Sequence, residues 1–222
     1  MKVLLFLLAF GSLSACEKKP ADYSKQEMMQ ETNIIDLVKK NDIAGVKSAL
    51  DNGADVNTRD KKGRSLLLIA TIDRQTEMAK LLVSCKADVN LQDDQLDSPF
   101  LYAGASGQTE LVRLFLENGA RFDIFNRYNG TALIPACERG HVETVKVLVK
   151  TKGFPVNHIN RLGWTALMEA VILGNGTQKY QEIVKILKDN GSDLTIPDRS
   201  GKTPLQHAEE LGFAEIVQIL KS

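Results

Sequence analysis

The segment Thr203-Pro204-Leu205 is followed by Ala208, five residues after the threonine, and by Gly212, nine residues after it. The same order of residue types recurs along the chain, with the initial Ser or Thr spaced by 33, 33, 34 and 38 residues. The five units begin at Ser65, Ser98, Thr131, Thr165 and Thr203. A period of roughly 20–50 residues is typical of stacked repeats. We therefore expect one supersecondary unit to be repeated along the chain.

Each part of the unit has a structural role. The Ser or Thr hydroxyl can cap a first helix, and a proline behind it fits the first helical position, where no N–H is needed. The glycine supplies left-handed backbone geometry before a second helix. An apolar stripe such as Leu81-Leu82 or Ile219-Leu220 marks each second helix. Since no unit can bury this stripe alone, stacking has to stabilise the units.

With closing motifs such as Gly53-Ala54-Asp55-Val56-Asn57, the pattern resembles the ankyrin repeat over residues 33–222. The resemblance implies an all-α repeat fold, an ankyrin solenoid of helix-turn-helix units with short β-hairpin fingers. We expect an N-terminal cap at residues 33–57 and five repeats at about residues 58–222.

Two features depart from the repeat. Leu96 replaces the glycine of other fingers, which puts the turn of finger two in doubt. Repeat four carries about five extra residues around 175–180, between its two helices. This insertion is either a tolerated surface loop or a loop that contacts a partner.

The amino-terminal residues resemble the signal of a bacterial lipoprotein. Lys2 precedes a short apolar run, and Cys16 follows the small residues of Leu13-Ser14-Ala15. The resemblance implies a signal peptide at residues 1–15, lipidation of Cys16 and a flexible tether at residues 16–32. The apolar run is shorter than the ~20 residues that cross a bilayer, so acyl chains would anchor the protein. The alternative is an ordinary cleaved signal with a coincidental cysteine.

The predicted location is therefore a bacterial membrane, with the repeats facing the periplasm. In a Gram-negative cell the outer membrane is favoured, because Glu17 rather than aspartate follows the cysteine. The chain has 28 basic and 28 acidic residues and no long basic run, so we expect no nucleic-acid partner. Its length suits one repeat domain, and we expect a monomer.

Residues that could carry catalysis are sparse. We predict a structural role for His141, and we expect no carboxylate at metal-ligand or triad spacing beside His158 or His207. The chain has no nucleophile elbow, no phosphate-binding loop and no cysteine pair with zinc spacing. We therefore expect no enzyme, no cofactor and no metal, and we expect Cys137 to be a small core residue.

By resemblance, ankyrin proteins bind partners with their finger tips and the concave face of the first helices. Trp164, the only tryptophan, lies at a finger position that the repeat leaves free to be polar. Trp, Tyr and Arg dominate interface hot spots, so fingers three and four are the predicted binding site. The predicted contacts there are Phe125, Arg127, Tyr128, Arg139, Arg161, Leu162, Trp164 and Ile172. The alternative is that Trp164 packs over the neighbouring finger.

Fingers one and two add charged residues to the predicted surface. They are Arg59, Lys61, Lys62 and Arg64 in finger one, and Asp94 and Asp97 in finger two. Either the two tips steer a dipolar partner, or they are solvated tips that bridge each other.

Location and architecture together predict a membrane-anchored, periplasmic, non-catalytic protein-binding module. The most specific hypothesis is an immunity or inhibitor protein that neutralises an antibacterial toxin, such as a lipase effector, by covering its catalytic cleft. The alternative is an envelope scaffold or holdase that stabilises a resident periplasmic enzyme. The predicted partner is a secreted toxin or a periplasmic enzyme, and the membrane is contacted through the lipid anchor.

Overall fold

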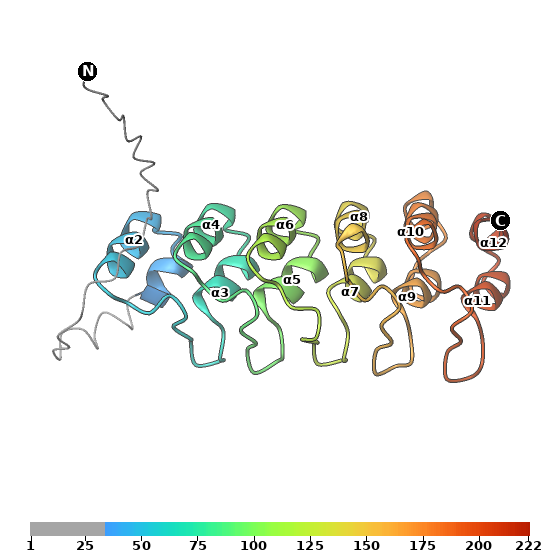
Figure 1. The fold of residues 1–222 in the computed structure, drawn as a ribbon, viewed down its shortest axis with the longest axis horizontal. Helices are drawn as coiled ribbons and strands as arrows, with labels where there is room; N and C mark the ends of the chain where they lie inside the picture. The colour runs from blue at the N-terminus through green and yellow to red at the C-terminus, as the bar shows by residue number, and fades with distance from the viewer. Residues whose placement is uncertain (1–33) are drawn as a thin grey trace, which may run out of the picture.

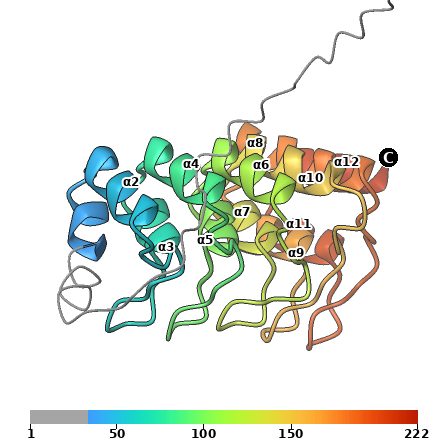
Figure 2. The same ribbon diagram turned by 60° about the vertical axis from the view of Figure 1, so that its left-hand side comes forward.

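Residues 34–222, the part of the chain that the computed structural model describes, form pairs of antiparallel helices that stack in a row (Figure 1). One helix of each pair belongs to an inner layer and the other to an outer layer, and the connecting fingers project together beyond the inner layer (Figure 2). The predicted signal peptide, Cys16 and the tether lie outside the described residues. No helix in the described part combines the length and the apolar character needed to cross a membrane.

The helix bounds follow the repeat. A helix over residues 34–39 pairs with α2 (Ile43–Asp51) in the cap. The inner helices are α3 (Leu66–Ile72), α5 (Pro99–Ala105), α7 (Leu133–Glu138), α9 (Ala166–Ile172) and α11 (Pro204–Glu210). The outer helices are α4 (Thr76–Ser84), α6 (Thr109–Glu117), α8 (Val142–Lys150), α10 (Gln178–Asp189) and α12 (Ala214–Lys221). The predicted all-α ankyrin solenoid is confirmed. Within residues 34–222 the fingers hold one isolated β-bridge, between Arg59 and Ser65, and no extended strands.

The hydroxyl caps form in four of the five repeats. The side chains of Ser65, Ser98, Thr165 and Thr203 each accept a hydrogen bond from the backbone N–H three residues on. The predicted cap at Thr131 is wrong: its Oγ1 is buried and has no hydrogen-bond partner within residues 34–222. The reason is Pro135, which has no N–H to donate to the Thr131 carbonyl, so helix α7 starts late, at Leu133.

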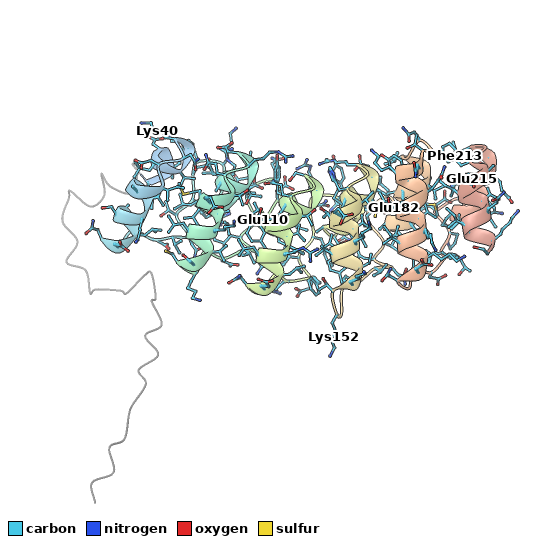
Figure 3. All side chains as sticks on the ribbon, turned by 90° about the horizontal axis from the view of Figure 1, so that it is seen from above. Lys40, Glu110, Lys152, Glu182, Phe213 and Glu215 are labelled. Atoms are coloured by element: carbon cyan, nitrogen blue, oxygen red, sulfur yellow. The ribbon has the colours of Figure 1, made fainter. Side chains whose placement is uncertain are left out.

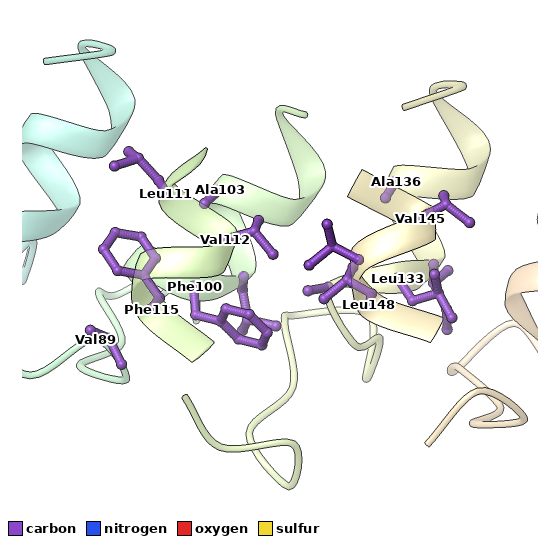
Figure 4. Packing of buried hydrophobic residues seen from close by; sticks show 14 of the residues in the cluster. Val89, Phe100, Ala103, Leu111, Val112, Phe115, Leu133, Ala136, Val145 and Leu148 are labelled. Carbon is purple, nitrogen blue, oxygen red and sulfur yellow. The ribbon is translucent and has the colours of Figure 1, made fainter. Parts of the chain in front are cut away.

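Side chains between the two layers and between neighbouring repeats form one continuous core. Figure 4 shows Phe115 and Leu111 of α6 against Phe100 and Ala103 of α5, with Leu148 of the next repeat beyond them. These side chains are almost completely removed from solvent. Each large one contributes about 1.5–3 kcal/mol by its burial, and most of that burial exists only because another repeat is stacked beside it. Cys137 is fully buried and is a free thiol, as predicted.

Residues 178–180 of the insertion in repeat four form the first turn of α10, whereas residues 175–177 stay outside the helix. Helix α10 has 12 residues, whereas α4, α6 and α8 have 9 each. Its first turn contains Tyr180, which is buried and donates its hydroxyl hydrogen to the Glu138 carbonyl oxygen at 2.8 Å. The added residues therefore pack against the preceding repeat.

The outer helices present a charged face, seen from above in Figure 3. Lys80 lies 2.8 Å from Glu77 of its own helix and 2.6 Å from Glu110 of the next repeat. Lys146 bridges Glu143 and Glu182 in the same way, at 2.8 Å each. Acidic and basic groups thus neutralise one another across repeats on this face.

Candidate partner-binding groove

Each finger is built around one Asp or Asn side chain. Its Oδ1 accepts hydrogen bonds from the backbone N–H groups two and four residues later, at 2.8 to 3.1 Å. The five residues are Asp60, Asp93, Asn126, Asn160 and Asp198. Each stands five residues before the Ser or Thr that begins the unit, so the spacing was visible in the sequence, but our sequence analysis missed it. We call this arrangement the finger hub.

The third residue after the hub residue has a positive φ in every finger. Glycine occupies this position in fingers one, four and five. Asn129 has φ 57° in finger three, and Leu96 has φ 60° in finger two. The turn of finger two is therefore the same as that of its neighbours, and Leu96 adopts a left-handed conformation that is unfavourable for a leucine. The turn geometry of finger two, which the sequence left in doubt, matches that of the other fingers, and the departure is strain at Leu96 alone.

Neighbouring fingers are joined by hydrogen bonds that fix their spacing. The backbone N–H of Arg161 donates to the Tyr128 carbonyl oxygen at 2.8 Å, and Gln92 Nε2 donates to the Phe125 carbonyl oxygen at 2.8 Å. Arg127 lies 3.2 Å from Asp97 of the preceding finger. Fingers two, three and four therefore form a connected wall beside the inner helices.

Between this wall and the inner helices lies a hollow of about 450 Å³, which we call the central groove. Its lining residues are Asp97, Tyr102, Ala105, Asn126, Arg127, Tyr128, Gly130, Ile134, Pro135, Glu138, Arg139, Asn160, Leu162, Glu169 and Leu173. Three of them are large apolar side chains that are about half exposed: Tyr128, Leu162 and Leu173. An apolar centre with charged groups around it is the usual composition of a protein contact site.

Several charged side chains of the central groove have partners within the protein. The guanidinium of Arg127 contacts Asp97 and also lies over the ring of Tyr128, 5.4 Å from its centroid. Arg139 Nη1 donates to the Ala105 carbonyl oxygen at 2.8 Å. The carboxyl of Asp97 is partly buried, and the loss of hydration raises its pKa although Arg127 opposes the shift.

Glu169 is the most deeply buried ionisable residue in the central groove, with 5% of its surface exposed. Its Oε1 accepts a hydrogen bond from the Asn160 amide at 2.7 Å. Burial, with the charge of Glu138 nearby, raises the pKa of Glu169 to about 7. Our sequence analysis did not select Glu169, because its position on a first helix suits many residue types.

Of the eight contact residues that we predicted on fingers three and four, four line the central groove and four do not. Arg127, Tyr128, Arg139 and Leu162 line the central groove. Phe125, Arg161, Trp164 and Ile172 do not line it. The Phe125 ring stacks on the His158 ring with centroids 4.3 Å apart, and the backbone of Trp164 bonds to the hub residue Asn160. Trp164 is half-buried, which fits the alternative that this side chain packs within the finger layer.

The charged residues of fingers one and two are also separated. The basic side chains Arg59, Lys61, Lys62 and Arg64 line a second hollow of about 480 Å³ at the N-terminal end of the row. Arg64 pairs within its own finger, with Asp60 at 2.6 Å. Fingers one and two are linked by the N–H of Asp94, which donates to the Lys62 carbonyl oxygen at 3.2 Å, and by Arg59 Nη2, which donates to the Gln92 carbonyl oxygen. Of the two acids predicted to bind a partner, only Asp97 lines the central groove.

One expectation about the histidines is wrong. His207 Nε2 lies 2.8 Å from Asp198 Oδ2, because the finger hub brings that carboxylate over helix α11. His158 Nε2 lies 2.6 Å from the Asn129 carbonyl oxygen, so its polar contact is to backbone. Within residues 34–222 no three His, Cys, Asp or Glu side chains are grouped closely enough to hold a metal ion.

Comparison with known proteins gives consistent matches. A family model for three copies of ankyrin repeats matches residues 34–126 and 121–198. The ankyrin repeat protein YahD of Escherichia coli K12 is 37% identical over 182 residues, which are 82% of this chain and 90% of YahD. A solved ankyrin repeat domain from Acinetobacter baumannii AYE has a TM-score of 0.83 at 45% identity, covering 86% of this chain and 97% of that domain. The solved ankyrin repeat protein EF0377 has a TM-score of 0.83 at 41% identity, covering 85% and 96%.

Proposed function

Because this chain belongs to the ankyrin-repeat family, we propose that it is a protein-binding module whose partner sits in the central groove. The observation that carries the proposal is the cluster of half-exposed apolar side chains, Tyr128, Leu162 and Leu173, at the mouth of that groove. Large apolar groups held in water by a rigid scaffold lower the free energy of a complex when a partner covers them. Within residues 34–222 the outer face offers no such cluster, and its Lys and Glu side chains pair with one another.

We further propose that the protein is anchored by lipid at Cys16 and faces the periplasm. The support is the lipoprotein-like order of residues around Cys16. A Cys16→Ser form of the full chain should lose incorporation of labelled palmitate and leave the membrane fraction. Continued labelling, or unchanged membrane association, would contradict the anchor.

For the biological role we propose an immunity or inhibitor protein that neutralises an antibacterial toxin, such as a lipase effector, by direct binding. A groove bordered by protruding fingers suits occlusion of a catalytic cleft on another protein. Sensitive bacteria that express the chain should survive the toxin encoded beside its gene. If deletion instead causes an envelope-stress defect with no competitor present, the scaffold or holdase role replaces this one.

The binding site itself is tested by a double variant, Tyr128→Ala with Leu162→Ala. Loss of two such anchors should weaken partner capture by more than tenfold, since interface hot spots contribute about 2 kcal/mol each. The matched control is Ile43→Ala with Leu211→Ala, which removes two similarly exposed apolar side chains at the two ends of the row. Equal binding by both double variants would show that the partner does not use the central groove.

A further inference from the structure

Glu169 stands out when the five inner helices are compared at the same position, four residues after the unit's first Ser or Thr. Helices α3, α5 and α7 carry Ile69, Tyr102 and Pro135 there. Helix α11 carries His207, which is bonded to Asp198. Helix α9 places a carboxylate at this position, where it is 95% removed from solvent and lines the central groove.

Only one of the two carboxylate oxygens of Glu169 accepts a hydrogen bond within the described residues. Oε1 accepts the Asn160 amide hydrogen, whereas no donor of residues 34–222 bonds to Oε2. Oε2 is still reached by solvent, so it can accept a hydrogen bond from a ligand that enters the groove. The open side of this side chain is the central groove.

A second carboxylate, Glu138, lies near enough to act electrostatically on Glu169. Within the described part of the chain neither acid forms an ion pair with a basic side chain at 4.0 Å or less. The two arginines of the central groove have other partners: Arg127 is bound to Asp97, and Arg139 donates to the Ala105 carbonyl oxygen. Glu169 and Glu138 are therefore two acidic groups on the helix side of the groove with which no basic side chain of the described residues is paired.

We propose that the central groove takes up an arginine side chain of the partner protein, with its guanidinium on Glu169 Oε2 and Glu138. This inference rests on the proposed binding function and names the chemistry of the partner. The flat guanidinium offers five N–H donors, which can serve two carboxylates at once, and its aliphatic stem suits the apolar walls formed by Leu162 and Leu173. Lysine has a compact, strongly hydrated head and fits two carboxylates less well.

Proton release should accompany this binding. Free Glu169 has a pKa of about 7, so about half of the molecules carry a proton on this residue at neutral pH. The guanidinium favours the ionised form and displaces that proton. Of the groups packed around Glu169, α7 contributes Glu138 and the Cys137 thiol, and finger four contributes Asn160. On α11 the residue at the same repeat position as Glu169 is His207, which is hydrogen-bonded to Asp198.

The test uses two capped peptides with the full chain. One is acetyl-Leu-Arg-Leu-amide, and the other carries citrulline, the neutral isostere, in place of arginine. The arginine peptide should bind about tenfold more tightly at pH 8 than at pH 6, as expected when a group of pKa near 7 must ionise. The citrulline peptide should bind at least tenfold more weakly at pH 8 and show little dependence on pH. A lysine peptide should bind more weakly than the arginine peptide.

Glu169→Gln is the decisive variant, because it keeps an oxygen for the Asn160 amide and removes the charge. It should lose both the preference for arginine over citrulline and the dependence on pH. Glu110→Gln, on the outer helix α6, is the matched control and should bind as the unchanged protein does. If the two peptides bind alike, or if Glu169→Gln keeps the pH dependence, the arginine site is wrong.

Failure of this inference is distinguishable from failure of the binding function. A natural partner that binds the Glu169→Gln form normally but is lost with the Tyr128 and Leu162 double variant uses the groove without an arginine. A partner retained by both variants does not use the groove at all.

Discussion

The carboxyl group of Glu169 works against folding at neutral pH. Its pKa rises from an ordinary value of 4.5 to about 7 in the folded protein, so the folded state binds more protons than the unfolded state between these values. Stability from this group is full below about pH 4.5, falls as the pH rises, and is lost above about pH 7. Glu169 thus costs stability under the conditions in which its charge is available to a partner.

Glu169→Gln should therefore stabilise the protein at pH 8 by about 1–3 kcal/mol, because glutamine is buried without the cost of a charge. At pH 4.5 the two proteins should differ little. Urea unfolding at both pH values measures the difference. A variant that is less stable than the original at pH 8 would contradict the raised pKa.

Leu96 is a second residue that opposes folding, in this case through its backbone conformation. It has φ 60° in an exposed turn, where other fingers use glycine or asparagine. Leu96→Gly should raise stability by about 0.5–1 kcal/mol, since relief of the left-handed strain exceeds the entropy that glycine adds to the unfolded chain. The reverse change, Gly63→Leu, should destabilise finger one, because a Cβ there meets Asp94 Oδ1 at 2.6 Å. Thermal unfolding of the two variants should shift in opposite directions.

Individual residues also mark the limit of what the sequence predicts. Spacing located the caps, but Thr131 fails as a cap because a proline follows four residues later, a local steric effect that the repeat pattern does not contain. Trp164 was selected for its residue type, whereas its half-buried place depends on how neighbouring fingers pack. Glu169 was missed because its burial depends on how the helices and fingers pack, which its own stretch of sequence does not show.

The helices were predicted far better than the environments of individual residues. Every repeat has the expected pair of helices, because each pair is defined by caps, glycines and an apolar stripe within about 33 residues. The finger hub was not predicted, although Asp or Asn stands five residues before each unit's first residue. Five repeated acceptors for backbone N–H groups explain why the fingers keep their path without strand pairing over most of their length.

Close packing of inner helices makes a clear prediction at Gly104 of α5. A Cβ added there would lie 2.7 Å from the Ala132 Cβ and 2.9 Å from the Ala132 carbonyl oxygen of the next repeat. Gly104→Ala gains about 1 kcal/mol of helix propensity, but overpacking against backbone costs about 1–3 kcal/mol. We expect a net loss of up to about 2 kcal/mol in the free energy of unfolding, measured with urea. As a control, a Gly to Ala change in an exposed, unhindered helix should stabilise, so a more stable Gly104→Ala form would show that the repeats can separate without cost.

Within residues 34–222 the molecule should be least stable at its two ends. The N-terminal cap buries only Ile34, Val38, Val46 and Leu50. The last repeat has few buried residues: only Pro204 and Ala208 in α11, and Ile216 and Leu220 in α12. Helix α3, in contrast, has six buried residues among its seven. Stability in repeat proteins is a sum over units and their interfaces, and α12 has a neighbouring repeat on one side only.

Hydrogen exchange followed by mass spectrometry should therefore show the fastest exchange within residues 34–222 in the N-terminal cap and in α11 and α12. The slowest exchange should occur in α5, α7 and α9, which have neighbours on both sides. Uniform protection along the row would indicate that the repeats unfold as one unit. Faster exchange in the middle than at the ends would contradict the burial pattern.

The finger hub has a consequence for how this protein can change. One side chain and two backbone N–H groups set the loop path, so the side chains at the tips, such as those of Lys62, Tyr128 and Leu162, are not needed to hold it. The five tips therefore present different side chains on the same backbone support. The choice of partner protein can be changed by transferring a few tip side chains from one finger to another, while the fold that displays them stays the same.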